Sequence, residues 1–177
     1  GTVLYTARCP EFVTEEGQST AAENCRKLGI DGMVVIGGDG SFRGARQLCL
    51  HGIPTVAVPG TIDRDVSSSD YTIGFDSAMN TTLGMIDCLR DTCESHARCN
   101  VVEVMGRDCG QIALYTAIAA GAVAAIVPEL PFDEAELIQR MKDLVKTGKR
   151  SFLIVISEGV FTPDGKKMVS FMYDSFS

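Results

Sequence analysis

The chain has 177 residues, of which 45% are hydrophobic, enough to bury a core of ordinary globular size. Its formal net charge of -7 at pH 7 excludes the broad positive surface typical of nucleic-acid-binding proteins, so no nucleic-acid partner is expected. The uncharged stretch 112–127 falls short of the roughly 20 residues that cross a bilayer and is followed by Pro128, so no membrane span is expected.

The seven cysteines are an odd number, include no C-x-x-C pair and match no zinc-ligand spacing. This usage predicts reduced thiols and a cytoplasmic protein. No positively charged, apolar leader opens the sequence, so secretion is not expected. The first residue is Gly1 and not Met, and we therefore expect the chain to be a piece of a longer one.

Short apolar runs alternate with amphipathic segments along the chain. The pattern predicts strands at residues 2–6, 33–36, 55–58, 100–106, 123–127 and 151–159, and helices at 19–28, 41–50, 75–93, 110–120 and 133–148. Such alternation is typical of βαβ units and predicts an α/β fold, a doubly wound, mostly parallel sheet with helices on both faces. A turn at 163–165 opens a weakly patterned C-terminal segment.

Four polar loops each follow a predicted strand. They are GGDG after Ile36, PGTIDRD after Val58, MGRDCG after Val104 and SEG after Ile156. Because ligands bind beyond the carboxyl ends of the strands in parallel sheets, these loops together predict a binding site.

The first loop, GGDGS, runs from a strand into a helix. Gly38 and Gly40 let the backbone approach a bulky anion, and the helix near Ser41 directs its free N–H groups and dipole toward it. An aspartate there repels phosphate unless a divalent cation lies between them, so Asp39 is interpreted as a Mg²⁺ ligand. The alternative is a glycine-rich turn in which Asp39 caps the helix. NAD kinases and lipid kinases have a similar loop, so the motif alone is not specific.

The loop PGTIDRDV is more informative. Asp63 and Asp65 are two residues apart and face the same way in an extended segment. Beside a polyphosphate, two carboxylates supply a general base and an orienting group for phosphoryl transfer to an alcohol, and Thr61 supplies a hydroxyl. The alternative is an Asp-rich surface turn.

The loops after the later strands add an arginine and a carboxylate. Arg107 suits bidentate pairing with a phosphate, and Glu158 either accepts hydrogen bonds from sugar hydroxyls or is an ordinary exposed carboxylate. Arg98 begins the strand that ends before Arg107, so it belongs to the far edge of the sheet. It serves a neighbouring subunit or is a solvated loop residue.

Eight motifs resemble, in order and spacing, those of bacterial-type 6-phosphofructokinases. They are RCPEF, VVIGGDGS, PGTIDRDV, DYTIGFDSAMNT, RDTCESHAR, VVEVMGR, CGQIALYTAIAAGA and VPE. The resemblance covers residues 1–159 as a partial phosphofructokinase-like α/β core, and residues 160–177 form a divergent tail. It implies a glycolytic enzyme, an allosteric homotetramer in the family, that uses ATP and Mg²⁺ to phosphorylate fructose 6-phosphate at its 1-hydroxyl.

The same resemblance implies roles for individual residues. Asp63 accepts the proton of the 1-hydroxyl, with Thr61 and Asp65 beside it. Asp39 holds Mg²⁺, and the ATP-binding residues are Arg8, Cys9, Gly38, Asp39, Gly40 and Ser41. The sugar phosphate is bound by Thr61, Ile62, Asp63, Met105, Gly106, Arg107 and Glu158, and by Arg98 lent from a neighbouring subunit. Arg90 and Gly121 match part of an effector site, which lacks an acidic residue at Val123.

The chain departs from the family at several points. Members that use pyrophosphate typically carry Asp at position 40 and Lys at position 60; both are Gly here, which predicts ATP as the donor. Where the family usually has Asn, Arg64 either stabilises transferred charge or pairs with Asp63. The family's opening nucleotide loop and its 6-phosphate loop are absent from the sequence. A pyrophosphate-dependent relative, or a non-catalytic remnant acting in nucleotide binding or subunit contact, is therefore the alternative.

Overall fold

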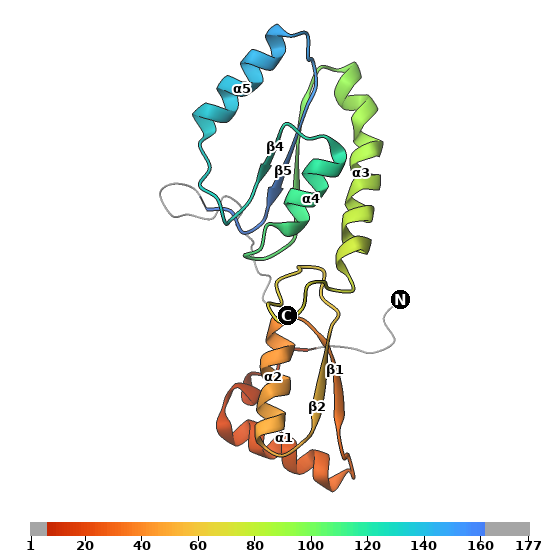
Figure 1. The fold of residues 1–177 in the computed structure, drawn as a ribbon, viewed down its shortest axis with the longest axis vertical. Coiled ribbons are helices and arrows are strands. Elements are labelled where there is room, and N and C mark those ends of the chain that lie inside the picture. Colours follow the sequence, from red (N-terminus) through yellow and green to blue (C-terminus); the bar gives the residue numbers. More distant parts are fainter. Residues whose placement is uncertain (1–6, 162–177) are drawn as a thin grey trace. The chain divides into compact units, whose positions relative to one another are not determined.

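The computed structural model describes residues 7–161, and the chain divides into two compact units. Unit 1 is Gly1–Gly60 and unit 2 is Thr61–Ser177. Each unit is built from parallel strands and helices (Figure 1), so each is described by itself.

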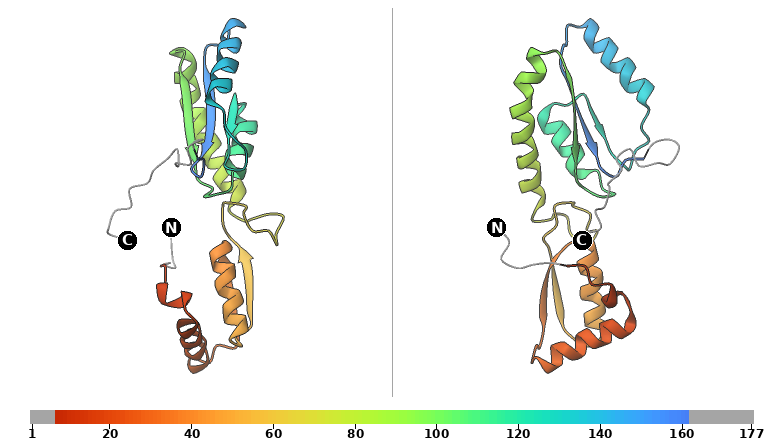
Figure 2. Two further views of the ribbon diagram at one scale, coloured as in Figure 1. Left: turned by 90° about the vertical axis from the view of Figure 1, so that its left-hand side faces the viewer. Right: turned by 180° about the vertical axis from the view of Figure 1, so that it is seen from behind.

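Unit 1 is a two-stranded parallel sheet with its helices on one side. Its elements in chain order are the 3-10 helix η1 (Pro10–Val13), α1 (Glu15–Lys27), β1 (Met33–Gly37), α2 (Asp39–Leu50) and β2 (Thr55–Pro59). Figure 2 shows α1 and α2 on the same side of the sheet. Ala22, Cys25, Leu48 and Ile53 form the core between them, whereas Val34, Ile36 and Val56 are exposed.

Both helices of unit 1 begin earlier than the periodicity predicts. Helix α1 starts at Glu15 because the Thr14 hydroxyl accepts a hydrogen bond from the Gly17 N–H and two glutamates occupy the first turn. Helix α2 starts at Asp39, directly after the N-cap Gly38, so the aspartate lies within the helix. The sequence pattern gave no sign of η1.

Unit 2 is a three-stranded parallel sheet. Its elements are α3 (Phe75–Ser95), β3 (Cys99–Val104), α4 (Gln111–Ala120), β4 (Ala124–Ile126), α5 (Glu134–Lys146) and β5 (Phe152–Ser157), and the strand order is β3-β5-β4. The register pairs Val104 with Ser157, so the segments that follow β3 and β5 leave the sheet side by side. The side chain of Asp133 caps α5, because it accepts hydrogen bonds from the N–H groups of Ala135 and Glu136.

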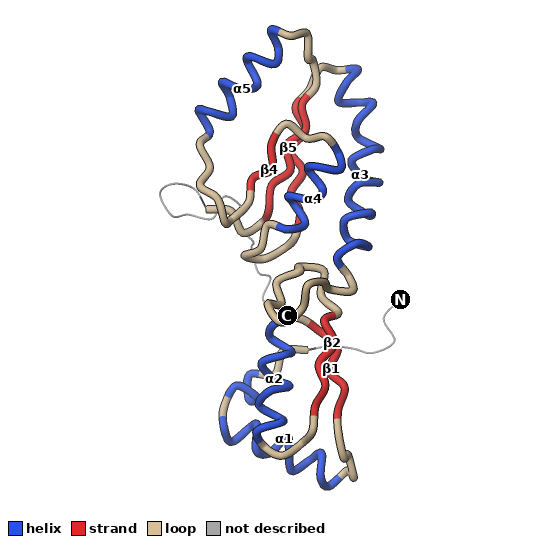
Figure 3. The backbone as a smooth tube through the Cα atoms, viewed as in Figure 1, coloured by secondary structure: helices blue, strands red, loops and turns tan. Residues whose placement is uncertain are grey.

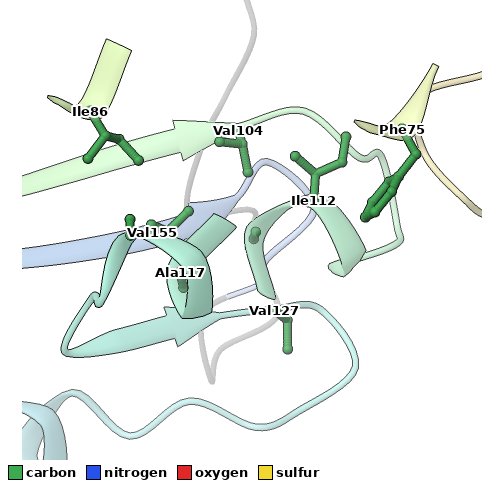
Figure 4. Packing of buried hydrophobic residues seen from close by; sticks show 9 residues of the cluster. Phe75, Ile86, Val104, Ile112, Ala117, Val127 and Val155 are labelled. Carbon is green, nitrogen blue, oxygen red and sulfur yellow. The ribbon is translucent and has the colours of Figure 1, made fainter. Parts of the chain in front are cut away.

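Alternate residues of β5 fill two different cores in unit 2. Val155 points to the face covered by α3 and α4, where it packs with Phe75, Ile86, Val104 and Ile112 (Figure 4). Ile154 and Ile156 belong to the second core, against which Leu137 and Met141 of α5 pack. Unit 2 therefore has helices on both faces of its sheet, as doubly wound folds do.

The predicted α/β class and the parallel strands are confirmed. The strands are divided between two sheets, and the polar segment 60–74 connects the last strand of unit 1 to α3 (tan in Figure 3). The strand predicted at 2–6 and the turn predicted at 163–165 lie outside the described residues. Within residues 7–161, none of the helices has the length and apolar character that a membrane crossing requires.

Candidate active site

The turn between β1 and α2 leaves the start of α2 open to a ligand. Among the described residues, no side chain caps this helix. The carbonyl of the N-cap residue Gly38 accepts a hydrogen bond from the Phe42 N–H. A Cβ on Gly37 would lie 2.3 Å from the Ser41 hydroxyl, whereas a Cβ on Gly40 would meet no described atom within 4 Å. Space and unpaired N–H groups at a helix N-terminus suit an anion.

Asp39 forms an ion pair at this turn. The Arg43 Nη2 atom lies 2.9 Å from Asp39 Oδ2, one helical turn along α2, and both side chains are partly exposed to solvent. The alternative that Asp39 caps the helix is wrong, because Gly38 holds the N-cap position and Asp39 is the first helical residue. The carboxylate is therefore free to contact a ligand, in competition with Arg43.

The residues of this turn fit a magnesium ion that is bound together with phosphates. Across the described chain, His, Cys, Asp and Glu side chains gather nowhere in groups of three that suit a metal centre made by the protein alone. Mg²⁺ in phosphotransfer sites is commonly held by one or two carboxylates plus substrate phosphates, so Asp39 alone matches that donor set. The open N-terminus of α2 beside it suits the phosphates.

Arg8 and Cys9 precede η1 and are exposed. The Cys9 thiol donates a hydrogen bond to Glu11. The Phe12 ring in the same segment lies against Gly44 of α2, 3.2 Å from where a Cβ on that glycine would be. The segment carrying Arg8 and Cys9 thus leads into an element that packs on α2, the helix that begins with Asp39.

In unit 2, the segment from Thr61 to Asp65 forms a tight turn. The Thr61 hydroxyl accepts a hydrogen bond from the Asp63 N–H at 3.1 Å, and the Thr61 carbonyl accepts one from Gly74. Ile62 packs against the main core of unit 2 and anchors the turn. Arg64, between the two aspartates, has a φ of 55°, which lies in the left-handed region.

The segments that follow β3 and β5 are tied together by Glu158. Its Oε1 atom accepts hydrogen bonds from the N–H groups of Gly106, at 3.1 Å, and of Arg107, at 2.7 Å. Both donors have positive φ, 143° for Gly106 and 56° for Arg107. The predicted role of Glu158 towards sugar hydroxyls rests on its other oxygen, because this one holds the turn. Met105 beside it is largely exposed.

Charges of three neighbours act on Asp63. Burial raises the pKa of the Asp63 carboxyl above its ordinary value, and the charges of Asp65 and Glu158 raise it further, against the opposing effects of the Thr61 side chain and the Arg107 charge. The structure therefore brings Asp63, Asp65, Arg107 and Glu158 together in unit 2. A carboxylate with a raised pKa is a better proton acceptor near neutral pH.

Asp65 and Cys109 complete this cluster. The buried Oδ1 atom of Asp65 has no hydrogen-bond partner among the described residues. Burial raises the pKa of the Cys109 thiol, with further contributions from Glu129, Asp65 and Asp63, so the thiol stays neutral. A buried, unpaired carboxylate oxygen is costly unless a ligand satisfies it, and this one lies beside the candidate base.

Arg98 and Arg90 lie away from this cluster. Arg98 directly precedes β3, whereas Arg107 follows it, so a strand about 20 Å long separates them. Arg90 donates a hydrogen bond to the Ala120 carbonyl at the end of α4, and it lines a small hollow together with Gly121. Lys149 and Ser151 line the same hollow, and the sequence pattern gave no reason to place them there.

Two further residues hold the site although sequence reasoning assigned them no role. Glu129 accepts a hydrogen bond from the Gly110 N–H at the start of α4, at 2.8 Å. A Cβ on Gly159 would lie 1.9 Å from the Arg107 carbonyl oxygen, so only glycine fits there. Glu129 is the last residue of the VPE motif, so the resemblance could have drawn attention to it. The requirement for glycine at position 159 arises from the folded structure and could not have been read from the sequence.

Comparison with known proteins identifies the family. The sequence model described as Phosphofructokinase matches residues 1–176. The chain belongs to the phosphofructokinase family. Its relatives include the ATP-dependent 6-phosphofructokinases of Bacillus velezensis, 54% identical over 160 residues, and of Alkaliphilus metalliredigens, 58% identical over 160 residues. In each case the alignment covers 90% of this chain and 50% of the relative.

The fold is shared with solved phosphofructokinases. The match to the phosphofructokinase of Saccharomyces cerevisiae covers 96% of this chain and 26% of the yeast chain, with a TM-score of 0.82 and 34% sequence identity. The chain spans about half the length of the curated relatives it matches.

Proposed function

We propose that this chain is part of an enzyme that phosphorylates fructose 6-phosphate with ATP to give fructose 1,6-bisphosphate. The observation that carries the proposal is the Asp63 carboxyl, whose pKa is raised by burial and by Asp65 and Glu158, beside the cationic Arg107. Proton abstraction from an alcohol needs such a base, and a sugar phosphate needs a cation near it. The name of the relatives, ATP-dependent 6-phosphofructokinase, supports the same reaction.

Unit 2 supplies the residues for the sugar phosphate. Asp63 takes the proton of the 1-hydroxyl, and Thr61 holds the Asp63 backbone in place through its hydroxyl. Arg107 binds a phosphate oxygen, because its backbone is fixed by Glu158 and its planar guanidinium suits two parallel hydrogen bonds to a phosphate. Ile62, Met105 and Gly106 complete the acceptor side of the site.

Unit 1 supplies the residues for the nucleotide. Gly38, Gly40 and Ser41 receive its phosphates at the start of α2, with Arg8 and Cys9 from the segment before η1. Asp39 holds Mg²⁺, which when bound neutralises the phosphate charge and favours departure of the leaving group. Arg43 must release Asp39 for that contact, since it pairs with the same carboxylate.

The two glycines at positions 40 and 60 favour ATP over pyrophosphate. A Cβ at Gly40 would meet no described atom within 4 Å, so the space that an aspartate would fill remains for the nucleotide. A Cβ at Gly60 would lie 2.8 Å from Ile36 Cγ2, so a lysine there would collide with β1.

Assembly, location and regulation follow from the same assignment. Arg98 serves the site of a neighbouring copy, because it stands at the opposite end of β3 from Arg107, and the protein acts as a homo-oligomer. All seven cysteines, each within the described residues, are free thiols, which favours the cytoplasm. The hollow lined by Arg90, Gly121 and Lys149 takes an anionic effector.

A coupled assay tests the proposal against its alternatives. The purified chain is given fructose 6-phosphate and Mg²⁺ with either ATP or pyrophosphate, and Asp63→Asn is the matched variant. We expect turnover with ATP that falls by about 10²-fold or more in the variant. Turnover with pyrophosphate alone would favour the pyrophosphate-dependent alternative. Nucleotide binding without turnover would favour the non-catalytic remnant.

A further inference from the structure

We propose that Arg64 is a positioning residue, whose guanidinium is held by three aromatic rings and thereby fixes the turn that carries Asp63 and Asp65. This inference rests on the proposed function, which makes Asp63 the base. Arg64 stands where the resemblance to the family leads us to expect Asn.

The backbone of Arg64 is in a conformation that needs support. Its φ of 55° lies in the left-handed region, which Asn and Gly adopt far more readily than a long side chain does. Such strain persists only where the surroundings over-determine it. Because Arg64 separates the two aspartates, a change in its backbone would turn both carboxylates.

The side chain supplies that support. The guanidinium carbon lies 4.7 Å from the ring centroid of Tyr71, 5.2 Å from that of Phe75 and 5.1 Å from that of Tyr115. Its Nε atom donates a hydrogen bond to the Asp70 carbonyl at 3.2 Å. All three rings lie within the range in which a cation is attracted to the face of an aromatic ring.

The rings form a rigid receptor. Phe75 is fully buried at the start of α3 and makes edge-to-face contacts with Tyr71, at 5.8 Å, and with Tyr115 of α4, at 5.5 Å. The Tyr71 hydroxyl donates a hydrogen bond to Asp76 at 2.7 Å. The guanidinium therefore ties the turn to two helices of unit 2 whose own positions are set by the core.

This placement argues against one of the two interpretations of Arg64, the ion pair with Asp63. The guanidinium lies over the rings, and the charges that shift the Asp63 carboxyl are those of Asp65, Glu158 and Arg107. An ion pair between Arg64 and Asp63 would lower the pKa of Asp63, whereas that pKa is raised. Arg64 acts on the base through the backbone, and its charge is engaged elsewhere.

Two sets of variants test the proposal. Arg64→Asn keeps a residue that accepts the left-handed backbone but removes the cation, and Arg64→Lys restores a cation without the planar guanidinium. Tyr115→Leu removes one ring from the receptor, and Tyr115→Phe keeps the ring as the matched control. The readouts on the full chain are the amide exchange of Asp63, whose N–H bonds to Thr61, and the NMR titration of its carboxyl carbon.

In Arg64→Asn we expect the Asp63 amide to exchange about two- to fivefold faster, the size of effect that loss of a partly exposed cation–aromatic contact produces. The pKa of Asp63 falls toward its ordinary value, because a loosened turn admits water. Arg64→Lys recovers part of both effects. Tyr115→Leu moves both readouts the same way, Tyr115→Phe moves neither, and adding Tyr115→Leu to Arg64→Asn changes little more.

The proposal is overturned if Arg64→Asn leaves the exchange and titration of Asp63 unchanged, or if the effects of Arg64→Asn and Tyr115→Leu simply add. The Val155 amide in the core reports global unfolding, so a change shared equally by Asp63 and Val155 also overturns it. Neither readout needs a substrate. An inactive chain that showed the expected shifts would refute the proposed function and leave the role of Arg64 standing.

Discussion

Removal of the Glu158 side chain should release the turn that presents Arg107. The carboxylate accepts two hydrogen bonds through one oxygen, from Gly106 at 3.1 Å and Arg107 at 2.7 Å. A hydrogen bond to a charged group contributes about 1.5–3 kcal/mol when buried, and these partly exposed ones contribute about 1 kcal/mol each because water replaces them. Glu158→Ala should therefore lower the free energy of unfolding by about 2 kcal/mol.

The matched variant Glu158→Gln separates the hydrogen bonds from the charge. Its amide oxygen still accepts from both N–H groups, so the loss should be about half as large. In a chain of this size, 1 kcal/mol changes the Tm by about 2–4 °C, so calorimetry should show a fall of about 4–8 °C for Glu158→Ala and about 2–4 °C for Glu158→Gln. Both variants should also lower the pKa of Asp63, since Glu158 raises it through its charge.

Glu103→Ala on the exposed side of β3 is the control for simple loss of a surface carboxylate, and it should change the Tm by less than about 1 °C. This role of Glu158 is contradicted if Glu158→Ala melts within about 1 °C of the wild type. It is also refuted if Glu158→Gln is as unstable as Glu158→Ala, because the retained acceptor would then have no effect.

Three further variants probe neighbouring features. Asp63→Asn should raise the Tm at pH 7, because folding raises the pKa of the Asp63 carboxyl. The stability that protonated Asp63 contributes is complete below its unfolded pKa and is lost as pH rises through its folded pKa, so the neutral Asn is favoured at pH 7. This increase in Tm should vanish near pH 3, and an increase that persisted there would contradict the assignment. Gly159→Ala should cost about 2–3 kcal/mol and lower the Tm by about 4–12 °C, since its Cβ would meet the Arg107 carbonyl; an unchanged melting curve would show that the backbone yields freely. Arg43→Gln should tighten Mg²⁺-dependent nucleotide binding by about twofold in calorimetric titration, because an exposed ion pair with Asp39 is worth little; weaker binding would mean that Arg43 itself contacts the nucleotide.

The element order and the proximity of Asp63, Arg107 and Glu158 were predictable from the sequence. The alternation of apolar runs and amphipathic segments predicted every described helix and strand except η1, because local periodicity depends on which face of an element is buried. The placement of Arg107 and Glu158 together follows from one rule, that polar segments after neighbouring parallel strands emerge at the same edge.

The rest depends on tertiary contacts that no local pattern records. Periodicity identifies strands but not their partners, so the division into two sheets was not predictable. The sequence suggested that the Glu158 carboxylate is available to sugar hydroxyls, yet one of its oxygens accepts hydrogen bonds from the N–H groups of Gly106 and Arg107. Both of these residues have positive φ, which the sequence pattern did not predict. The receptor for Arg64 draws one ring from a loop and two from different helices, which only the folded chain brings together.

Under the proposed function, the turn carrying Asp63 and the segments after β3 and β5 form the binding site for a sugar phosphate. Titration of the ¹⁵N-labelled chain with fructose 6-phosphate, followed by NMR, tests it most directly. We expect the shifted amides to map to Thr61–Asp65, Met105–Arg107 and Glu158. Shifts confined to the hollow around Arg90 and Lys149, or none at a large excess of the sugar phosphate, would contradict it.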